Sequence, residues 1–330
     1  MACLLAKLHC PKVDIRKPYT EIGDADSFSG RTYDERDITP FINKHNLPCN
    51  NTTGFLTPAF RNLNVALTKN VNLIGRPPQL YPAVLNLLDD VHSGRITADD
   101  LMAEVVRLLL IKRNKQQRRI EELVETLSTT KDAIPLSSED IINLIEKHMS
   151  LKGTSRLPVL VVAAAYQSAE DFLREKVLPL KAHNAADKQT GALGDVEITL
   201  VADNKVVTSY EMKNKRVTRE DIDQALQKLQ SSNRRVDNYI FITTHPVDGE
   251  VQDYARSLYD KTGGIEFVIL DCIGFIRHFL HLFHWLRTRF LEAYQALLLS
   301  EPQSAVSQPV KEAFLAMRQT AEMGIEEEQT

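Results

Sequence analysis

The spacing of apolar residues changes twice along the chain and divides it into three regions. Before about residue 80, short apolar segments alternate with Asn, Thr, Pro and Gly, which predicts loops and short helices. Between about 80 and 150 the apolar positions recur every three to four residues, the period of an amphipathic helix. We expect three helices there, each with a polar cap or a glycine stop, over 82–94, 96–127 and 136–153.

Beyond Pro158 the pattern alternates between helical and strand-like segments. The expected elements are a helix over 159–180, a hairpin over 194–215, a helix over 219–232, a strand over 238–244, a helix over 250–264, a strand over 265–271 and a long helix over 273–299. Helices that alternate with strands in this way predict an α/β fold. We expect a loop and helix region over 1–150 and an α/β region over 151–330.

Composition places the chain among ordinary globular proteins. Of 330 residues, 43% are hydrophobic and 25% are charged, which argues against wholesale disorder, a collagen-like repeat or a coiled-coil rod. No apolar run approaches the ~18 residues of a membrane span, and the N-terminus lacks a signal-peptide core. Four scattered cysteines argue against a disulfide framework or a cysteine zinc site. We therefore expect a cytoplasmic protein without a membrane partner.

Two carboxylates in the expected hairpin are candidates for chemistry. If Val201 faces Lys205, Asp195 lies opposite Glu211, and both side chains share one face of the sheet. A two-residue turn at Asp203–Asn204 would separate them by one position. The pairing therefore requires either a loop of odd length or a bulge.

Paired carboxylates on apolar strands repel each other unless a cation lies between them. Oxygen ligands of this kind suit Mg²⁺, which keeps several waters and bridges to substrate phosphate. Lys213 projects to the same side as Glu211 and could orient or help to deprotonate an attacking water. These three residues predict metal-assisted hydrolysis of a phosphodiester. No nucleotide-binding loop, dinucleotide fingerprint or serine nucleophile elbow is present in the sequence.

Asp195 followed by Glu211-x-Lys213 resembles the motif of the PD-(D/E)xK nuclease superfamily, with Gly194 where a proline often stands. Three longer runs are similar to the SacI family of type II restriction endonucleases, and the similarity extends over nearly the whole chain. They are 17–42 (KPYTEIGDADSFSGRTYDERDITPFI), 51–64 (NTTGFLTPAFRNLN) and 183–226 (HNAADKQTGALGDVEITLVADNKVVTSYEMKNKRVTREDIDQAL).

The resemblance implies a restriction-endonuclease-like core, in which helices flank a central mixed sheet. It implies a type II site-specific deoxyribonuclease that uses Mg²⁺ to cut both strands of a short palindromic DNA site and leaves 5′-phosphate ends. The enzyme would be a homodimer, and a DNA methyltransferase of the same restriction-modification system would protect the host genome. Asp195 and Glu211 would bind Mg²⁺, while Lys213 would assist the attacking water.

Further residues are candidates for the metal site. Glu197 shares a strand face with Asp195 and is either another ligand or an exposed strand residue. In related nucleases a carboxylate on the preceding helix completes the site, which makes Glu170 a candidate. His183 and Asp187, in the polar loop before the hairpin, stay open because turn chemistry explains them equally well.

Local charge favours DNA although the net charge of the chain is −4. Residues 205–235 contain eight Lys or Arg and four acidic residues, so a basic segment surrounds the carboxylates. The candidate DNA contacts are Lys215, Arg216 and Arg219 in this segment and Arg31, Asn51, Thr52, Thr53 and Arg61 in the N-terminal region, to which we assign sequence recognition.

Two alternatives stay open. The chain could be another nuclease of the superfamily, such as a junction resolvase or a modification-dependent Mrr-like enzyme. It could also be a catalytically inactive DNA-binding protein on the same fold, although the complete Asp…Glu-x-Lys set argues against decay. The aromatic segment Phe275–Phe290 carries three histidines spaced three apart, which diverge around a helix, so we expect a packing or dimer helix there.

Overall fold

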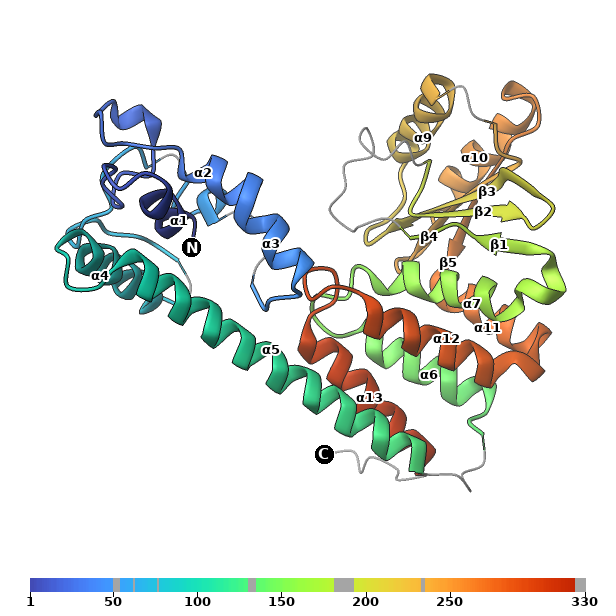
Figure 1. The fold of residues 1–330 in the computed structure, drawn as a ribbon. Coiled ribbons are helices and arrows are strands. Elements are labelled where there is room, and N and C mark those ends of the chain that lie inside the picture. Colours follow the sequence, from blue (N-terminus) through green and yellow to red (C-terminus); the bar gives the residue numbers. More distant parts are fainter. Residues whose placement is uncertain are drawn as a thin grey trace. The chain divides into compact units, whose positions relative to one another are not determined.

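In a computed structural model the protein forms two compact units. The first comprises Met1–Glu121 with Pro302–Ser304, and the second comprises Glu122–Glu301 with Ala305–Thr330 (Figure 1). The structure describes residues 1–49, 54–61, 63–75, 77–129, 135–180, 193–232 and 235–323. The boundary between the units falls inside a long helix and not near residue 150.

The first unit consists of helices, single helical turns and loops. Its elements are α1 (Ala2–His9), η1 (Thr20–Ile22), α2 (Gly30–Tyr33), η2 (Asp34–Ile38), α3 (Thr39–Lys44), η3 (Gly54–Leu56), α4 (Leu80–His92) and the first part of α5 (Ala98–Thr129). Leu85, Leu88 and Val91 on one face of α4 pack with Ile15 and Leu67 in a buried cluster. The loops are thus held by the apolar stripe of a helix.

Helix boundaries follow the caps seen in the sequence. The backbone N–H of Asp100 donates to Thr97 Oγ1 at 3.0 Å before α5. Ser137 and Asp140 form a reciprocal capping box at the start of α6 (Ser138–Met149). Gly94 and Gly153, with φ of 74° and 79°, lie in the left-handed region just beyond α4 and α6.

A five-stranded mixed sheet is the centre of the second unit. The strands lie in chain order as β1 (Glu175–Val177), β2 (Val196–Leu200), β3 (Asp203–Lys213), β4 (Asn238–Thr243) and β5 (Glu266–Asp271). The β1–β2 and β2–β3 pairs are antiparallel, and the β3–β4 and β4–β5 pairs are parallel. The other helices of the unit are α7 (Leu157–Leu173), α9 (Arg219–Ser232), α10 (Gly249–Lys261), α11 (Cys272–Leu282), η4 (His284–Leu286), α12 (Arg287–Ser300) and α13 (Gln308–Glu322).

Helices cover both faces of this sheet (Figure 1). On one face, Tyr239 and Phe241 of β4 belong to a buried cluster with residues of α9 and α10. On the other face, the Tyr210 hydroxyl lies 2.8 Å from that of Tyr166 on α7, and its ring lies 6.2 Å from that of Phe275 on α11. The α/β prediction therefore holds as a mixed sheet between helical layers.

Two predicted helices are wrong in extent. The helix expected over 159–180 ends at Leu173, and after the left-handed residue Arg174 (φ 55°) the chain forms β1. There Glu175 pairs with Leu200, so hydrogen bonds to β2 replace those of a longer helix. Long-range pairing of this kind overrides local helix propensity.

The helix expected over 273–299 breaks at Phe283 into α11 and α12. The break brings the ring centroids of Phe279 and Phe290 to 6.1 Å. In a continuous helix, residues eleven positions apart would be separated by about 16 Å along the axis. Core packing of these two rings therefore explains the turn between the helices.

A buried histidine links the three helices α6, α12 and α13. His148 of α6 is fully buried; its Nδ1 lies 2.9 Å from the Tyr294 hydroxyl on α12, and its Nε2 lies 2.9 Å from the carbonyl of Val310 on α13. Since a carbonyl only accepts, Nε2 carries the proton and Nδ1 accepts from the hydroxyl. Burial lowers the pKa of His148 to about 4, so the ring is neutral.

We predict that this histidine makes the second unit less stable in acid. In the unfolded chain its pKa is about 6.5, so between about pH 4 and pH 6.5 the unfolded state binds more protons. Its contribution is complete above about pH 6.5 and falls by about 3 kcal/mol as the pH drops to about 4.

Urea unfolding of wild type and His148→Gln at about pH 7.5 and about pH 4.5 measures this effect. Glutamine does not titrate, so the free energy of unfolding of the variant should fall less between the two pH values. An equal fall in both proteins would contradict the assignment.

Candidate active site

The β2–β3 hairpin brings the two predicted carboxylates to adjacent strands. Val196 faces Tyr210, and the backbone N–H of Asp195 donates to the carbonyl of Tyr210 at 2.7 Å. Continued by one residue, this register puts Asp195 opposite Glu211 on the same face of the sheet.

A bulge, and not an odd loop, produces this register. Leu200 faces Asp203, so the turn is the two residues between them and Asp203 already belongs to β3. Two register shifts flank Thr199. Without them the pairing at the turn would place Thr208 opposite Asp195, so the shifts advance β3 by three residues.

Gly194 allows the strands to approach at this point. A Cβ there would lie 2.4 Å from the carbonyl oxygen of Tyr210 and 2.5 Å from Ser209 Oγ. Both distances are shorter than any real carbon contact, so the position before Asp195 admits no side chain.

The Asp195 carboxylate is held by the neighbouring backbone. Its Oδ2 accepts the N–H of Met212 at 2.8 Å, while the residue still reaches solvent. Partial burial of the carboxyl raises its pKa, the negative charge of Glu211 raises it further, and the Met212 N–H opposes both. Two carboxylates that repel each other in this way are suited to share a cation.

Glu211 is fixed through both of its oxygens. Oε1 lies 2.7 Å from Lys213 Nζ, and Oε2 accepts the hydroxyl of Tyr239 from β4. Tyr239 is fully buried, and its hydroxyl also lies 2.8 Å from the carbonyl of Leu193. The side chains of Glu211 and Lys213 are 20% and 15% exposed, so the pair stays open to a ligand.

Lys213 has a further carboxylate partner, Asp221, in the first turn of α9. Its Nζ lies 3.0 Å from Asp221 Oδ1. Burial lowers the pKa of Lys213, but the hydrogen bonds and charges of Glu211 and Asp221 outweigh that effect and raise it. Lys213 is therefore an ammonium between two carboxylates.

The remaining metal candidates do not join this group. Glu197 is buried, with 6% of its surface exposed, and its Oε1 accepts the N–H of Leu193 at 3.1 Å. Glu170 lies on α7, which packs on the Tyr210 face, opposite to Glu211. Within the described ranges, no three His, Cys, Asp or Glu side chains are grouped to hold a metal ion.

Asp195 and Glu211 thus form a pair of carboxylates and not a cage. Mg²⁺ is commonly held by one or two carboxylates, with water and substrate phosphate as its other ligands. The donors present fit such an ion. The candidates His183 and Asp187 lie outside the described residues.

Three predicted DNA contacts surround the beginning of α9. Lys215, Arg216 and Arg219 are exposed; Lys215 Nζ lies 3.2 Å from Asp221, and the Arg219 guanidinium lies 5.5 Å from the ring centroid of Tyr254. Their side chains can reach a phosphate backbone near Lys213.

The other predicted DNA contacts belong to the first unit. Arg31 and Arg61 are exposed there, and Arg31 forms an ion pair with Glu35 at 2.7 Å. Asn51, Thr52 and Thr53 lie outside the described residues.

Sequence reasoning missed two residues of this site. Tyr239 stands in an apolar strand, where nothing in the sequence connects it to Glu211. Asp221 could have been identified from the sequence, because Thr218-x-x-Asp221 has the spacing of a helix cap and follows Lys213 closely.

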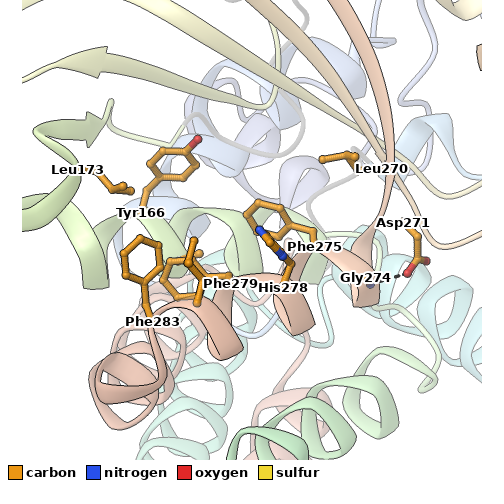
Figure 2. A pocket seen from close by; sticks show the side chains of 11 residues that line it. Tyr166, Leu173, Leu270, Asp271, Gly274, Phe275, His278, Phe279 and Phe283 are labelled. Carbon is orange, nitrogen blue, oxygen red and sulfur yellow. Dashed lines mark hydrogen bonds between the residues drawn. The ribbon is translucent and has the colours of Figure 1, made fainter.

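An apolar cavity of about 390 Å³ lies apart from these residues, between α7 and α11. Figure 2 shows Tyr166 and Leu173 on one side and Phe275, Phe279 and Phe283 on the other. Its lining is mostly apolar. The polar exceptions are His278 and Asp271, and the Asp271 carboxylate accepts the N–H of Gly274 at the start of α11.

Comparison with known families is consistent with the site. Residues 133–245 match the family described as SacI restriction endonuclease C-terminal domain. The match covers about a third of the chain and includes Asp195, Glu211, Lys213 and Asp221. No curated protein sequence matches the chain. The family match supports a restriction endonuclease, a nuclease whose substrate is DNA. Among the described helices, none is long and apolar enough to cross a membrane.

Proposed function

We propose that the protein is a type II restriction endonuclease of the PD-(D/E)xK kind, which hydrolyses phosphodiester bonds in double-stranded DNA with Mg²⁺. The observation that carries the proposal is the adjacent pair Asp195 and Glu211 with Lys213 at 2.7 Å from Glu211. The match to the SacI restriction endonuclease C-terminal domain supports it.

Asp195 and Glu211 would hold Mg²⁺ through their carboxylate oxygens. Bound there, the ion would polarise the phosphoryl group and make water a stronger nucleophile near neutral pH. Lys213 orients the attacking water and binds the developing negative charge through its ammonium. Water attacks phosphorus and the bond to O3′ breaks, which leaves a 5′-phosphate and a 3′-hydroxyl.

Basic residues around α9 hold the DNA backbone in this reaction. Lys215, Arg216 and Arg219 neutralise phosphates next to the scissile one, and contacts of this type position DNA without reading its sequence. The first unit, with Arg31 and Arg61, supplies sequence recognition. A methyltransferase of the same restriction-modification system protects the host site.

Substitution of the three central residues tests the mechanism. Glu211→Ala, Lys213→Ala and Asp195→Asn should each lower the rate of cleavage of unmethylated phage DNA by about 10²-fold or more. DNA binding should persist, because these residues serve the reaction and not base recognition.

Lys261→Ala is the matched control, since it removes an exposed lysine from α10. It should cleave at the wild-type rate. A Glu211 or Lys213 variant that also keeps that rate would show that the active site is elsewhere.

Divalent ions should separate binding from cleavage. In EDTA the protein should bind DNA weakly and leave it intact, because the unneutralised charges of Asp195 and Glu211 repel phosphate. Ca²⁺ should strengthen binding without cleavage, since it neutralises the carboxylates but activates water poorly.

Gel-shift titration with and without Ca²⁺ measures this, and Asp195→Asn should lose most of the Ca²⁺ effect. Rapid cleavage in excess EDTA would exclude the metal mechanism.

We further propose that the enzyme acts as a homodimer. A palindromic duplex has two scissile phosphates related by a two-fold axis, and the chain carries one Asp…Glu-x-Lys set, so two copies cut both strands most simply. Leu282 lines the apolar cavity between α7 and α11, and the ring of Trp285 lies 5.7 Å from that of Phe283, which also lines it. Leu282 and Trp285 are 55% and 56% exposed and are suited to the interface.

Leu282→Glu and Trp285→Glu should therefore yield folded monomers that nick DNA or leave it intact, as measured by light scattering and by the ratio of nicked to linear plasmid. Tyr259→Glu, at an equally exposed aromatic residue on α10 (53%), should remain a dimer. A wild-type protein that stays monomeric on DNA and still cuts both strands in one encounter would contradict the dimer.

A further inference from the structure

Asp221 is a buried carboxylate that the proposed reaction does not use. Its side chain is 5% exposed. A buried charge of this kind is costly unless several donors surround it. One of its oxygens forms ion pairs with Lys213 and Lys215, and the other accepts a hydrogen bond from Thr218.

The two oxygens of this carboxylate have separate partners. Oδ2 accepts the N–H of Thr218 at 3.0 Å and its hydroxyl at 3.1 Å, which fixes the side chain to the first turn of α9. Oδ1 is thereby directed towards Lys213 Nζ at 3.0 Å. The helix cap thus aims a negative charge at the active-site lysine.

Lys213 lies between two carboxylates that are anchored independently. Glu211 is fixed by Tyr239 of β4, and Asp221 is fixed by Thr218 at α9. If Glu211 binds a divalent cation, its attraction for the lysine is offset, because the cation repels an ammonium nearby. Asp221 then remains as the carboxylate that retains Lys213.

We propose that Asp221 is a positioning residue that keeps Lys213 at the scissile phosphate when the carboxylate pair is occupied by metal. The inference rests on the proposed function. A four-carbon lysine arm is flexible, so a second anchor is what makes its position reproducible during the reaction.

Asp221→Asn tests this proposal, since it keeps the shape of the side chain and an oxygen for the Thr218 cap but removes the charge. With enzyme in excess over unmethylated phage DNA and Mg²⁺, the single-turnover rate should fall about 10²-fold, the usual cost of a misplaced group. The Kd for the same DNA in Ca²⁺ should stay within about threefold. Asp221→Glu, which restores the charge, should recover part of the rate.

A measurement on the metal-free protein reports the contact directly. Lys213 should react slowly with an amine-acylating reagent in the wild type, as peptide mass spectrometry would measure. In Asp221→Asn its labelling should rise several-fold, because one of its two ion pairs is lost.

Asp223→Asn is the matched control. It makes the same change two residues along α9, where the carboxylate accepts the Tyr254 hydroxyl and not a lysine. It should keep the wild-type cleavage rate and the wild-type labelling of Lys213.

Circular dichroism checks the fold of each variant. If Asp221→Asn does not fold, Thr218→Ala replaces it, because that change removes one bond that aims Asp221 and should cause a smaller loss of rate. Wild-type cleavage by a folded Asp221→Asn, or lost cleavage with unchanged Lys213 labelling, would overturn the positioning role. A wild-type protein that cuts no DNA would overturn the proposed function itself. That failure differs from a failure of the Asp221 proposal, because Lys213 would still be labelled more in Asp221→Asn than in the wild type.

Discussion

The site depends on one constraint, the irregular pairing of β2 with β3. Register shifts at Thr199 move β3 by three positions, and this alone puts Glu211 beside Asp195. The arrangement has a cost: among the described residues, the buried hydroxyls of Thr199 and Ser209 lack hydrogen-bond partners. Gly194 contributes by leaving space where a side chain would collide with β3. A hairpin with shifted register and buried hydroxyls that lack partners is expected at a functional site and not in an ordinary sheet.

The core and the proposed active site share residues, so stability and chemistry are linked. Tyr239 belongs to the buried cluster under α9 and α10, and its hydroxyl reaches Glu211. Asp221 caps α9 and also holds Lys213. Glu211 and Asp221 are therefore fixed by different structural elements, and Lys213 forms an ion pair with each of them. This arrangement preorganises charge before substrate arrives, which is how electrostatic catalysis avoids reorganisation during the reaction.

Much of this arrangement could be predicted from local pattern. Strand alternation placed Asp195 opposite Glu211 and Lys213 on the same face as Glu211, and caps located the helices around Thr97 and Ser137. Pattern alone could not choose between an odd loop and a bulge, because both give the same pairing. The pattern also did not predict that the first helix of the α/β region ends at Leu173, because hydrogen bonds to β2 determine that end. It did not predict the break at Phe283 either, because packing of Phe279 against Phe290 determines it.

Within the site, the contacts that could not be predicted from the sequence are those between residues far apart in the chain. Tyr239 meets Glu211 across 28 positions, through parallel strand pairing that no local pattern encodes. The strand pattern left Glu197 as either a ligand or an exposed residue, whereas its side chain is buried and its carboxylate accepts the N–H of Leu193. The resemblance to nucleases with a helix carboxylate suggested Glu170, but α7 packs on the Tyr210 face of the sheet, opposite to Glu211.

Sequencing the ends of DNA fragments would show whether the protein is a site-specific nuclease. Unmethylated phage DNA is digested by the wild-type protein with Mg²⁺, and the fragment ends are ligated and read. We expect cuts in both strands at one recurring short palindrome, with 5′-phosphate ends. Intact DNA, or cuts confined to modified or branched DNA without a fixed sequence, would contradict it.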